Sequence, residues 1–131
     1  EQRFCNTYDF VNRMGFSKMH IFRFSPRPGT QASSLPGRVS ASEMRRRSKM
    51  LDNLEKELRE RFYRQYLNRE LVVLFERKMQ GKRENGRVFH SGFSSNYIKV
   101  LAPASEDEVN RLISVRINEV NCGFAIGEIL H

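Results

Sequence analysis

The stretch Ile113-Ser-Val-Arg-Ile-Asn118 decides the fold class of the second half of the chain. Apolar and polar residues alternate in it at every second position, which is the period of a β-strand with one buried face. Similar short runs lie on both sides, separated by turn residues. The sequence therefore predicts five strands. They are Glu70–Glu76, Arg87–His90, Tyr97–Leu101, Leu112–Val120 and Phe124–Leu130.

Five short strands within residues 69–131 predict a small, closed or nearly closed antiparallel barrel of the OB-like type. Closure favours such a fold because it leaves no strand edge unpaired. Turns are expected where glycine and asparagine gather between the strands. These turns are Gln80–Gly86, Ser91-Gly92 and Asn121–Gly123.

A long helix is predicted before the barrel, within residues 38–68. The stretch Ser40-Ala-Ser-Glu43 has the form of a capping box, in which the serine oxygen accepts from the backbone three residues later. An apolar stripe at helical spacing follows, and Lys and Arg occupy much of the remaining surface. The stripe consists of Met44, Leu51, Leu54, Leu58 and Phe62.

The first 37 residues predict a helix followed by a strand and a loop. Helical spacing of apolar residues predicts a helix over 3–14, with Gly15 as its C-cap. Met19–Phe24 has the composition of a buried strand, and Ser25–Ser40 is a loop that contains three prolines. The predicted fold class is therefore α+β. One strand cannot form a sheet alone, so this edge invites pairing with a second copy of the chain.

Charge is distributed unevenly along the 131 residues. The chain has 23 Lys and Arg against 15 Asp and Glu, a net charge of +8, and the excess lies before residue 100. A concentrated positive field favours a polyanionic partner such as nucleic acid, although surface cations also serve solubility. No apolar run is long enough to span a bilayer, so we expect a soluble, cytoplasmic protein without membrane contact.

Motifs for catalysis are missing from this sequence. It contains no glycine-rich phosphate loop, no nucleophile elbow and no zinc-protease motif. Cys5 and Cys122 lie at opposite ends of the chain without metal-ligand spacing, so we expect two buried free thiols and no metal site. The chain is therefore predicted to be catalytically incomplete.

A nucleic-acid site is indicated around the second and third predicted strands. Cations, an amide and aromatic rings gather there, the combination with which small barrels bind single-stranded RNA. The residues are Arg87, His90, Phe93, Asn96, Tyr97 and Lys99. The alternative is that Phe93 and Tyr97 are simply part of the barrel core.

Several motifs resemble the tRNA methylthiotransferases, which are radical-SAM enzymes. Those similar to the end of the radical-SAM domain are Met19–Thr30, Leu35-Pro36 and Arg47-Ser48. Those similar to the terminal TRAM domain are Arg69–Glu76, Gly92-Phe93, Asn96–Val100, Ile113–Ile117 and Gly127–Leu130. The motif Asn96–Val100 is most similar to the branch that acts on threonylcarbamoyl-adenosine in tRNA.

The resemblance implies the end of a larger enzyme. Members of the family bind two [4Fe-4S] clusters and S-adenosylmethionine and add a methylthio group to a modified adenosine next to the anticodon. The cluster cysteines of the family are missing here, so this segment is expected to hold no cofactor and to be inactive alone. Residues 1–37 would end the radical-SAM domain, 38–68 would be a connecting helix, and 69–131 would be the TRAM barrel.

The resemblance also implies roles for individual residues. Phe93 or Tyr97 would stack on a base, and Asn96 would bind a base edge or sugar. Three cations would contact tRNA phosphates, namely Arg87, Lys99 and Arg116. Ser25 and Arg27 would lie near the S-adenosylmethionine site of the whole enzyme, whose remaining radical-SAM domain would be a partner of this segment. Asn68 and Asn110 stand where the family has glycine, and asparagine tolerates a left-handed backbone.

Two other hypotheses remain open from the sequence. A free-standing RNA-binding barrel would give the segment 19–30 no role in an active site. A protein-interaction module would instead use the amphipathic helix, residues 41–66, to pack its apolar stripe on a partner.

Overall fold

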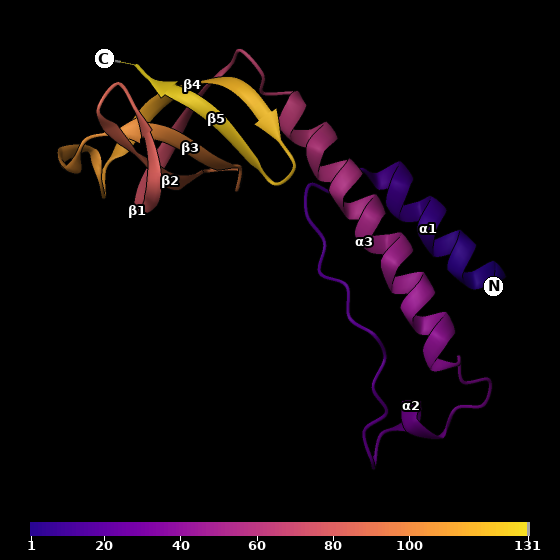
Figure 1. Cartoon of the computed structure of the whole chain (residues 1–131). Coiled ribbons are helices and arrows are strands. Elements are labelled where there is room, and N and C mark those ends of the chain that lie inside the picture. The colour runs from indigo at the N-terminus through magenta and orange to yellow at the C-terminus, as the bar shows by residue number, and fades with distance from the viewer. Residues whose placement is uncertain (131) are drawn as a thin grey trace. The chain divides into compact units, whose positions relative to one another are not determined.

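The protein contains helices in its first half and a β-barrel in its second half, so the α+β class is confirmed. The computed structural model describes residues 1–130, with Lys82 described only by its place in a strand. The chain divides into two compact units, residues 1–58 and 59–131. Figure 1 shows the order of the elements along the chain.

Three helices belong to the first half of the chain. Helix α1 (Gln2–Met14) ends at Gly15, which has a φ of 65° and donates its N–H to the Val11 carbonyl. Helix α2 (Gln31–Ser34) is a single turn, and α3 (Ala41–Arg64) begins after Ser40. The Ser40 hydroxyl oxygen accepts from the Glu43 N–H at 3.2 Å, which confirms the serine half of the predicted capping box.

Helix α1 lies beside α3 (Figure 1). Charged groups around a buried ring hold the two helices together. The Glu1 carboxylate pairs with Arg46 at 2.5 Å and with Arg47 at 2.8 Å. Both guanidinium groups lie over the ring of Phe4, 5.9 and 5.2 Å from its centroid. The Glu43 carboxylate accepts from the same two arginines, so four charged groups surround one apolar contact.

This network determines how Glu43 titrates. Hydrogen bonds from Arg46 and then from Arg47 lower the pKa of Glu43 from 4.5 to about 2. A lowered pKa means that the contact helps the fold above pH 4.5 and is lost as the pH falls toward 2. We expect the carboxyl NMR signal of Glu43 to titrate near 2, and Arg46→Gln to raise that midpoint. A midpoint that the substitution leaves unchanged would contradict the network.

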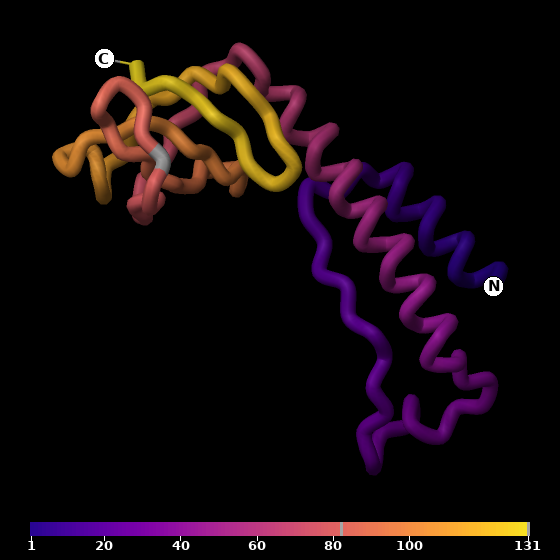
Figure 2. The backbone as a smooth tube through the Cα atoms, in the orientation of Figure 1, coloured from indigo at the N-terminus to yellow at the C-terminus, as the bar shows by residue number. Residues whose placement is uncertain are grey.

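The strand predicted at Met19–Phe24 is wrong, because residues 16–27 form neither a helix nor a strand. A β-strand needs a neighbouring strand to bind its N–H and C=O groups, and this apolar run has none in the described chain. The extended segment 19–24 runs along α3 (Figure 2). Ile21 and Arg23 of this segment line a hollow together with Arg45 and Lys49.

The second half closes into a barrel of five strands in the order β1-β2-β3-β5-β4. A short 3-10 helix, η1 (Glu106–Glu108), precedes β4. The strands are β1 (Glu70–Glu84), β2 (Arg87–Ser94), β3 (Lys99–Ala104), β4 (Leu112–Asn121) and β5 (Phe124–Ile129).

The predicted all-antiparallel pairing is wrong at one place. Strands β3 and β5 are parallel, with Val100 opposite Ala125, whereas the other four neighbouring pairs are antiparallel. The reason is geometric, since strand directions can alternate all the way round a closed ring only when the number of strands is even. A closed barrel of five strands must therefore contain a parallel pair.

Two of the predicted turns differ from the structure. Strand β1 continues through most of Gln80–Gly86 and turns only at Asn85-Gly86, whose φ values of 48° and 78° suit a two-residue hairpin turn. Ser91-Gly92 lies inside β2. A Cβ on Gly92 would lie 2.1 Å from the Leu74 carbonyl oxygen, so glycine allows a close approach of β1 at this point. The turn at Cys122-Gly123 is confirmed.

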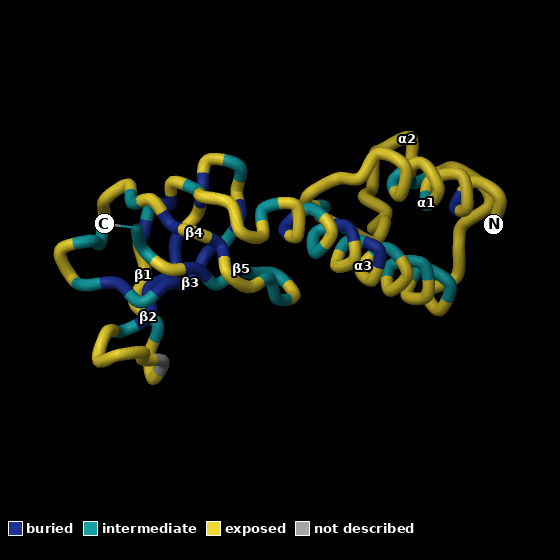
Figure 3. The backbone as a smooth tube through the Cα atoms, turned by 90° about the horizontal axis from the view of Figure 1, so that it is seen from above, coloured by how far each residue is buried: buried dark blue, intermediate teal, exposed yellow. Residues whose placement is uncertain are grey.

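Buried positions of the barrel gather along its strands (Figure 3). The barrel core also includes a ring from the last turns of α3. Tyr63 is buried, and its hydroxyl oxygen accepts from the Lys99 N–H at 3.1 Å. Asn68 and Asn110 adopt the left-handed backbone, with φ values of 62° and 61°. The buried core consists of Tyr63, Val73, Phe75, Ile98, Val100, Ala102, Val115, Ile117 and Ala125.

We expect Tyr63→Phe to destabilise the barrel by about 1–3 kcal/mol, because it leaves the Lys99 N–H without its acceptor. Tyr97→Phe makes the same chemical change at an exposed site and should alter stability by less than about 0.5 kcal/mol. Urea unfolding of the full chain, followed by amide NMR signals of β2 and β3, measures both. Equal effects of the two substitutions would contradict the structural role of Tyr63.

Candidate nucleic-acid interface

Four side chains form a row across the outer surface of the barrel. Phe93 in β2 lies opposite Lys99 in β3 and opposite Leu74 in β1, and Leu74 lies opposite Leu112 in β4. Directly opposite residues project from the same face of a sheet. Their neighbour Val73 points into the core, so this row faces outward. We call Lys99, Phe93, Leu74 and Leu112 the outer row.

The turn that joins β2 to β3 presents a second ring. The Tyr97 N–H donates to the Ser94 carbonyl at 2.9 Å, and the Ser94 hydroxyl donates to the Asn96 side-chain oxygen at 2.6 Å. The same hydroxyl oxygen accepts from the Ile98 N–H at 3.1 Å. Ser94 therefore organises a turn in which Tyr97 has a φ of 61°.

Both predicted stacking rings lie outside the core. Tyr97 is 81% exposed and Phe93 is 45% exposed, so the alternative that they are core residues is wrong. Asn96 is partly buried in the turn between them, and Lys99 is partly buried beside Phe93. The structure therefore brings four of the predicted contact residues together.

The other two predicted cations lie apart from this cluster. Arg87 begins β2, six residues before Phe93, which corresponds to about 20 Å along the strand. Arg116 donates to the Glu70 carboxylate at 2.9 Å and lies opposite Glu128 in β5. The residue opposite Arg116 in β1 is Glu70, which lies four residues before Leu74, or about 13 Å along the strand. The charge of Arg116 is therefore already partly neutralised within the barrel.

Some site residues were missed or misplaced by sequence reasoning. His90 is 1% exposed, and its Nδ1 lies 3.1 Å from the Val88 carbonyl oxygen, so it cannot join a surface site. Leu74 and Leu112 were not predicted, although Leu112 is 71% exposed. The alternation of side chains along β1 could have identified Leu74, because its neighbour Val73 points inward and successive side chains point to opposite faces.

Another charged pair lies between β1 and the η1 segment. Lys78 forms an ion pair with Glu106, and it lowers the pKa of that carboxyl. Both side chains are exposed, so the pair adds little stability. It does neutralise one cation of the β1–β2 hairpin, where Arg77 and Arg83 are also exposed.

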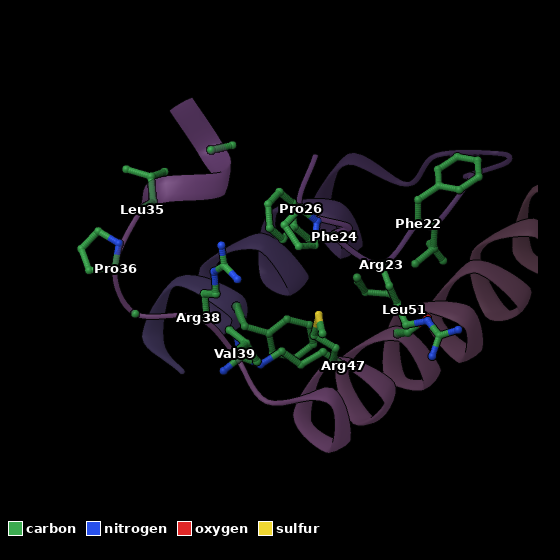
Figure 4. Close-up of a pocket in the computed structure, with 16 residues that line it drawn as sticks. Phe22, Arg23, Phe24, Pro26, Leu35, Pro36, Arg38, Val39, Arg47 and Leu51 are labelled. Atoms are coloured by element: carbon green, nitrogen blue, oxygen red, sulfur yellow. The ribbon is translucent and has the colours of Figure 1, made fainter. Parts of the chain in front are cut away.

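The predicted S-adenosylmethionine residues lie in the exposed segment of the first unit. Ser25 and Arg27 are both exposed, and the Arg27 carbonyl accepts from the Thr30 hydroxyl at 2.8 Å. Beside them is an apolar groove of about 540 Å³, lined by Phe22, Phe24 and Pro26 among others (Figure 4). No bound group is implied by this arrangement alone.

The two cysteines do not fit an iron-sulfur cluster. Such clusters take several cysteine thiolates, and the chain has two cysteines that belong to different units. Both thiols are exposed, so the prediction of buried thiols is wrong. Among the described residues no group of three or more His, Cys, Asp and Glu could hold a metal, and none of the helices described could cross a membrane.

Known proteins similar to this chain are enzymes that act on tRNA. It is 29% identical to a threonylcarbamoyladenosine tRNA methylthiotransferase of Bacillus subtilis over 117 residues, 89% of this chain and 26% of that protein. It is 25% identical over its whole length to a tRNA-2-methylthio-N(6)-dimethylallyladenosine synthase of Aliarcobacter butzleri, of which it covers 29%. No family model matches the chain.

A higher identity is confined to part of the chain. A threonylcarbamoyladenosine tRNA methylthiotransferase of Thermotoga maritima is 40% identical over 73 residues, which are 56% of this chain and 17% of that protein. The chain thus covers between 17% and 29% of the length of these relatives. The resemblance indicated by the motifs is confirmed, and the chain is a homologue of tRNA methylthiotransferases that corresponds to about a quarter of their length.

Proposed function

We propose that this chain is the tRNA-binding C-terminal portion of an enzyme that methylthiolates a modified adenosine next to the anticodon. The observation that carries the proposal is the exposure of Phe93 and Tyr97 beside Lys99 on a barrel whose interior is already filled. Exposed rings next to a cation form a platform for unpaired bases. The names of the relatives, which specify tRNA, support the choice of nucleic acid.

The barrel in this proposal is a TRAM domain. Its motifs resemble that domain, and a five-stranded closed barrel also has the strand number of the OB fold. OB folds bind oligonucleotides on the face of strands 2 and 3 and on the loops that join strands 1 and 2 and strands 4 and 5. Phe93 and Lys99 of the outer row lie on β2 and β3, which agrees with the strand part of that mode of binding. The outer row continues onto β1 and β4 through Leu74 and Leu112.

Each residue has a role in the proposed complex. Phe93 and Tyr97 stack on bases that leave the RNA stack, and each such contact is worth about 1–3 kcal/mol. Lys99 binds a phosphate, and the Asn96 amide binds a base edge or a sugar hydroxyl. Arg87 contacts a phosphate further along the RNA. Arg116 contributes less because Glu70 already binds it.

The proposed substrate is threonylcarbamoyl-adenosine. The motif Asn96–Val100 supports it, as do the names of the Bacillus and Thermotoga relatives. In the whole enzyme, [4Fe-4S] clusters and S-adenosylmethionine would supply the radical chemistry outside this segment. Because this segment cannot hold a cluster, we expect it to bind tRNA without methylthiolating it.

Filter binding of a tRNA anticodon stem-loop across a salt series tests the barrel assignment. Lys99→Gln should reduce the slope of log affinity against log salt by about 0.7–0.9, the value for one lost phosphate contact. Arg116→Gln removes the same charge and should change the slope less. Phe93→Leu should weaken binding by roughly 5- to 150-fold without changing the slope. An affinity for the stem-loop that does not depend on salt would contradict the proposed phosphate contacts. So would an affinity that stays unchanged when Lys99→Ala and Arg87→Ala are combined.

The apolar groove of the first unit supports a second proposal, that the remaining radical-SAM domain covers it in the longer protein. Phe22, Phe24 and Leu35 are 86%, 53% and 63% exposed, which is unusual for neighbouring large apolar residues. The groove they line, about 540 Å³, is mostly apolar (Figure 4). An uncovered surface of this kind favours association with another protein surface.

Without that cover, the chain should self-associate at high concentration. Light scattering should show a concentration-dependent mass that Phe22→Ser with Phe24→Ser abolishes. Phe93→Ser is the control, because it removes an exposed ring from the barrel instead. A chain that remains monomeric, or that self-associates equally after the groove substitutions, would count against a covered groove and against an interaction module.

A further inference from the structure

Helix α3 carries a line of exposed charges on the side away from its apolar stripe. The line consists of Arg45, Lys49, Asp52 and Lys56. Successive members are four, three and four residues apart, so all of them share one face of the helix. Each is exposed, whereas Leu54 and Leu58 of the apolar stripe are buried. We call the three basic members, Arg45, Lys49 and Lys56, the cation row.

The cation row differs from the arginines beside it. Arg46 and Arg47 are bound by Glu1 and Glu43. In residues 1–130, by contrast, the side chains of the cation row form no ion pair with a carboxylate. Asp52 is the single acidic group within the line. The charge of the cation row is therefore largely available to an external anion.

A fourth cation comes from the extended segment 19–24. Arg23 is exposed and joins two members of the cation row around a hollow of about 310 Å³. The hollow is lined by Ile21, Arg23, Arg45, Ser48, Lys49 and Asp52. Two guanidinium groups, one ammonium and one hydroxyl are donors suited to a phosphate, and Ser48 is the least exposed of these four.

We propose that the cation row, together with the hollow that Arg23 lines, binds the phosphate backbone of RNA. It is a second contact surface, in addition to the one proposed on the barrel. The choice of RNA rests on the proposed function. The row from Arg45 to Lys56 rises about 16 Å along the helix, the length of about five phosphates of one strand. A line of cations matches a linear polyanion, and the absence of an aromatic ring among the hollow's lining residues predicts binding without sequence preference.

The salt dependence of RNA binding by the full chain tests this surface. Arg45→Gln with Lys49→Gln should lower the salt slope for the anticodon stem-loop by about 1.4–1.8 and the affinity at 0.1 M salt by roughly 25- to 60-fold. Arg61→Gln with Arg64→Gln removes the same charge from the same helix, and Arg64 is already bound by Glu60. This control should change the slope by less than half as much, and circular dichroism verifies that both variants keep α3.

A substitution that strengthens RNA binding gives a second test, because a misfolded variant would lose affinity and not gain it. Asp52→Asn removes the carboxylate from the line and should tighten RNA binding by about 2- to 5-fold at 0.1 M salt. Glu57→Gln makes the same charge change about a third of a turn away from the line and should have a smaller effect. Equal effects of Asp52→Asn and Glu57→Gln would overturn the proposal. Tighter binding of the full chain to polyglutamate than to RNA would also overturn it. That result would assign the cation row to an acidic protein partner.

The results separate this surface from the barrel. If Phe93→Leu with Lys99→Gln removes binding and the Arg45/Lys49 variant keeps the wild-type slope, the cation row is refuted and the barrel function stands. If the Arg45/Lys49 variant lowers the slope and the barrel variant changes nothing, the barrel function fails and the cation row stands. A chain that binds no RNA refutes both.

Discussion

The hydrogen bond from the Lys99 N–H to the Tyr63 hydroxyl is the contact on which the outer surface of the barrel depends. Tyr63 fills part of the barrel core with its ring, and its hydroxyl oxygen satisfies a partly buried backbone donor. Because β3 begins at Lys99, the bond holds the start of that strand. The ladder then places Phe93 opposite Lys99 and Leu74 opposite Phe93. An interior contact thus determines which side chains stand together outside.

Close backbone approach is the second requirement of this barrel. A Cβ on Gly92 would meet the Leu74 carbonyl oxygen at 2.1 Å, and one on Gly127 would lie 2.5 Å from the Arg116 carbonyl oxygen. Both glycines lie within strands and approach the backbone of a neighbouring strand. Small barrels must bend their strands sharply, and positions without a side chain permit this bending. The two motifs that contain these glycines therefore carry structural information as well as a family resemblance.

Local sequence patterns predicted the elements better than their partners. The alternation in Leu112–Asn121 and the stripe in Ala41–Arg64 correctly indicated a strand and a helix, because one buried face imposes a period. The same logic failed where burial was absent. The polar end of β1 shows no such period, and the apolar Met19–Phe24 lacks the neighbour that would make it a strand. Pairing across the barrel, and so the separation of Arg87 and Arg116 from Phe93, depends on register that no single segment encodes.

The left-handed backbone of Tyr97 sets a compromise between the stability of the turn and the exposure of an aromatic ring. A bulky residue with a φ of 61° is held in a conformation that glycine or asparagine adopts at lower cost. Replacement by either would relax the turn, and selection for thermal stability alone would favour it. The same replacement would delete the most exposed aromatic ring of the barrel. An engineered, more stable version of this domain would therefore lose, at the residue where its backbone improved, the ring on which the proposed RNA contact depends.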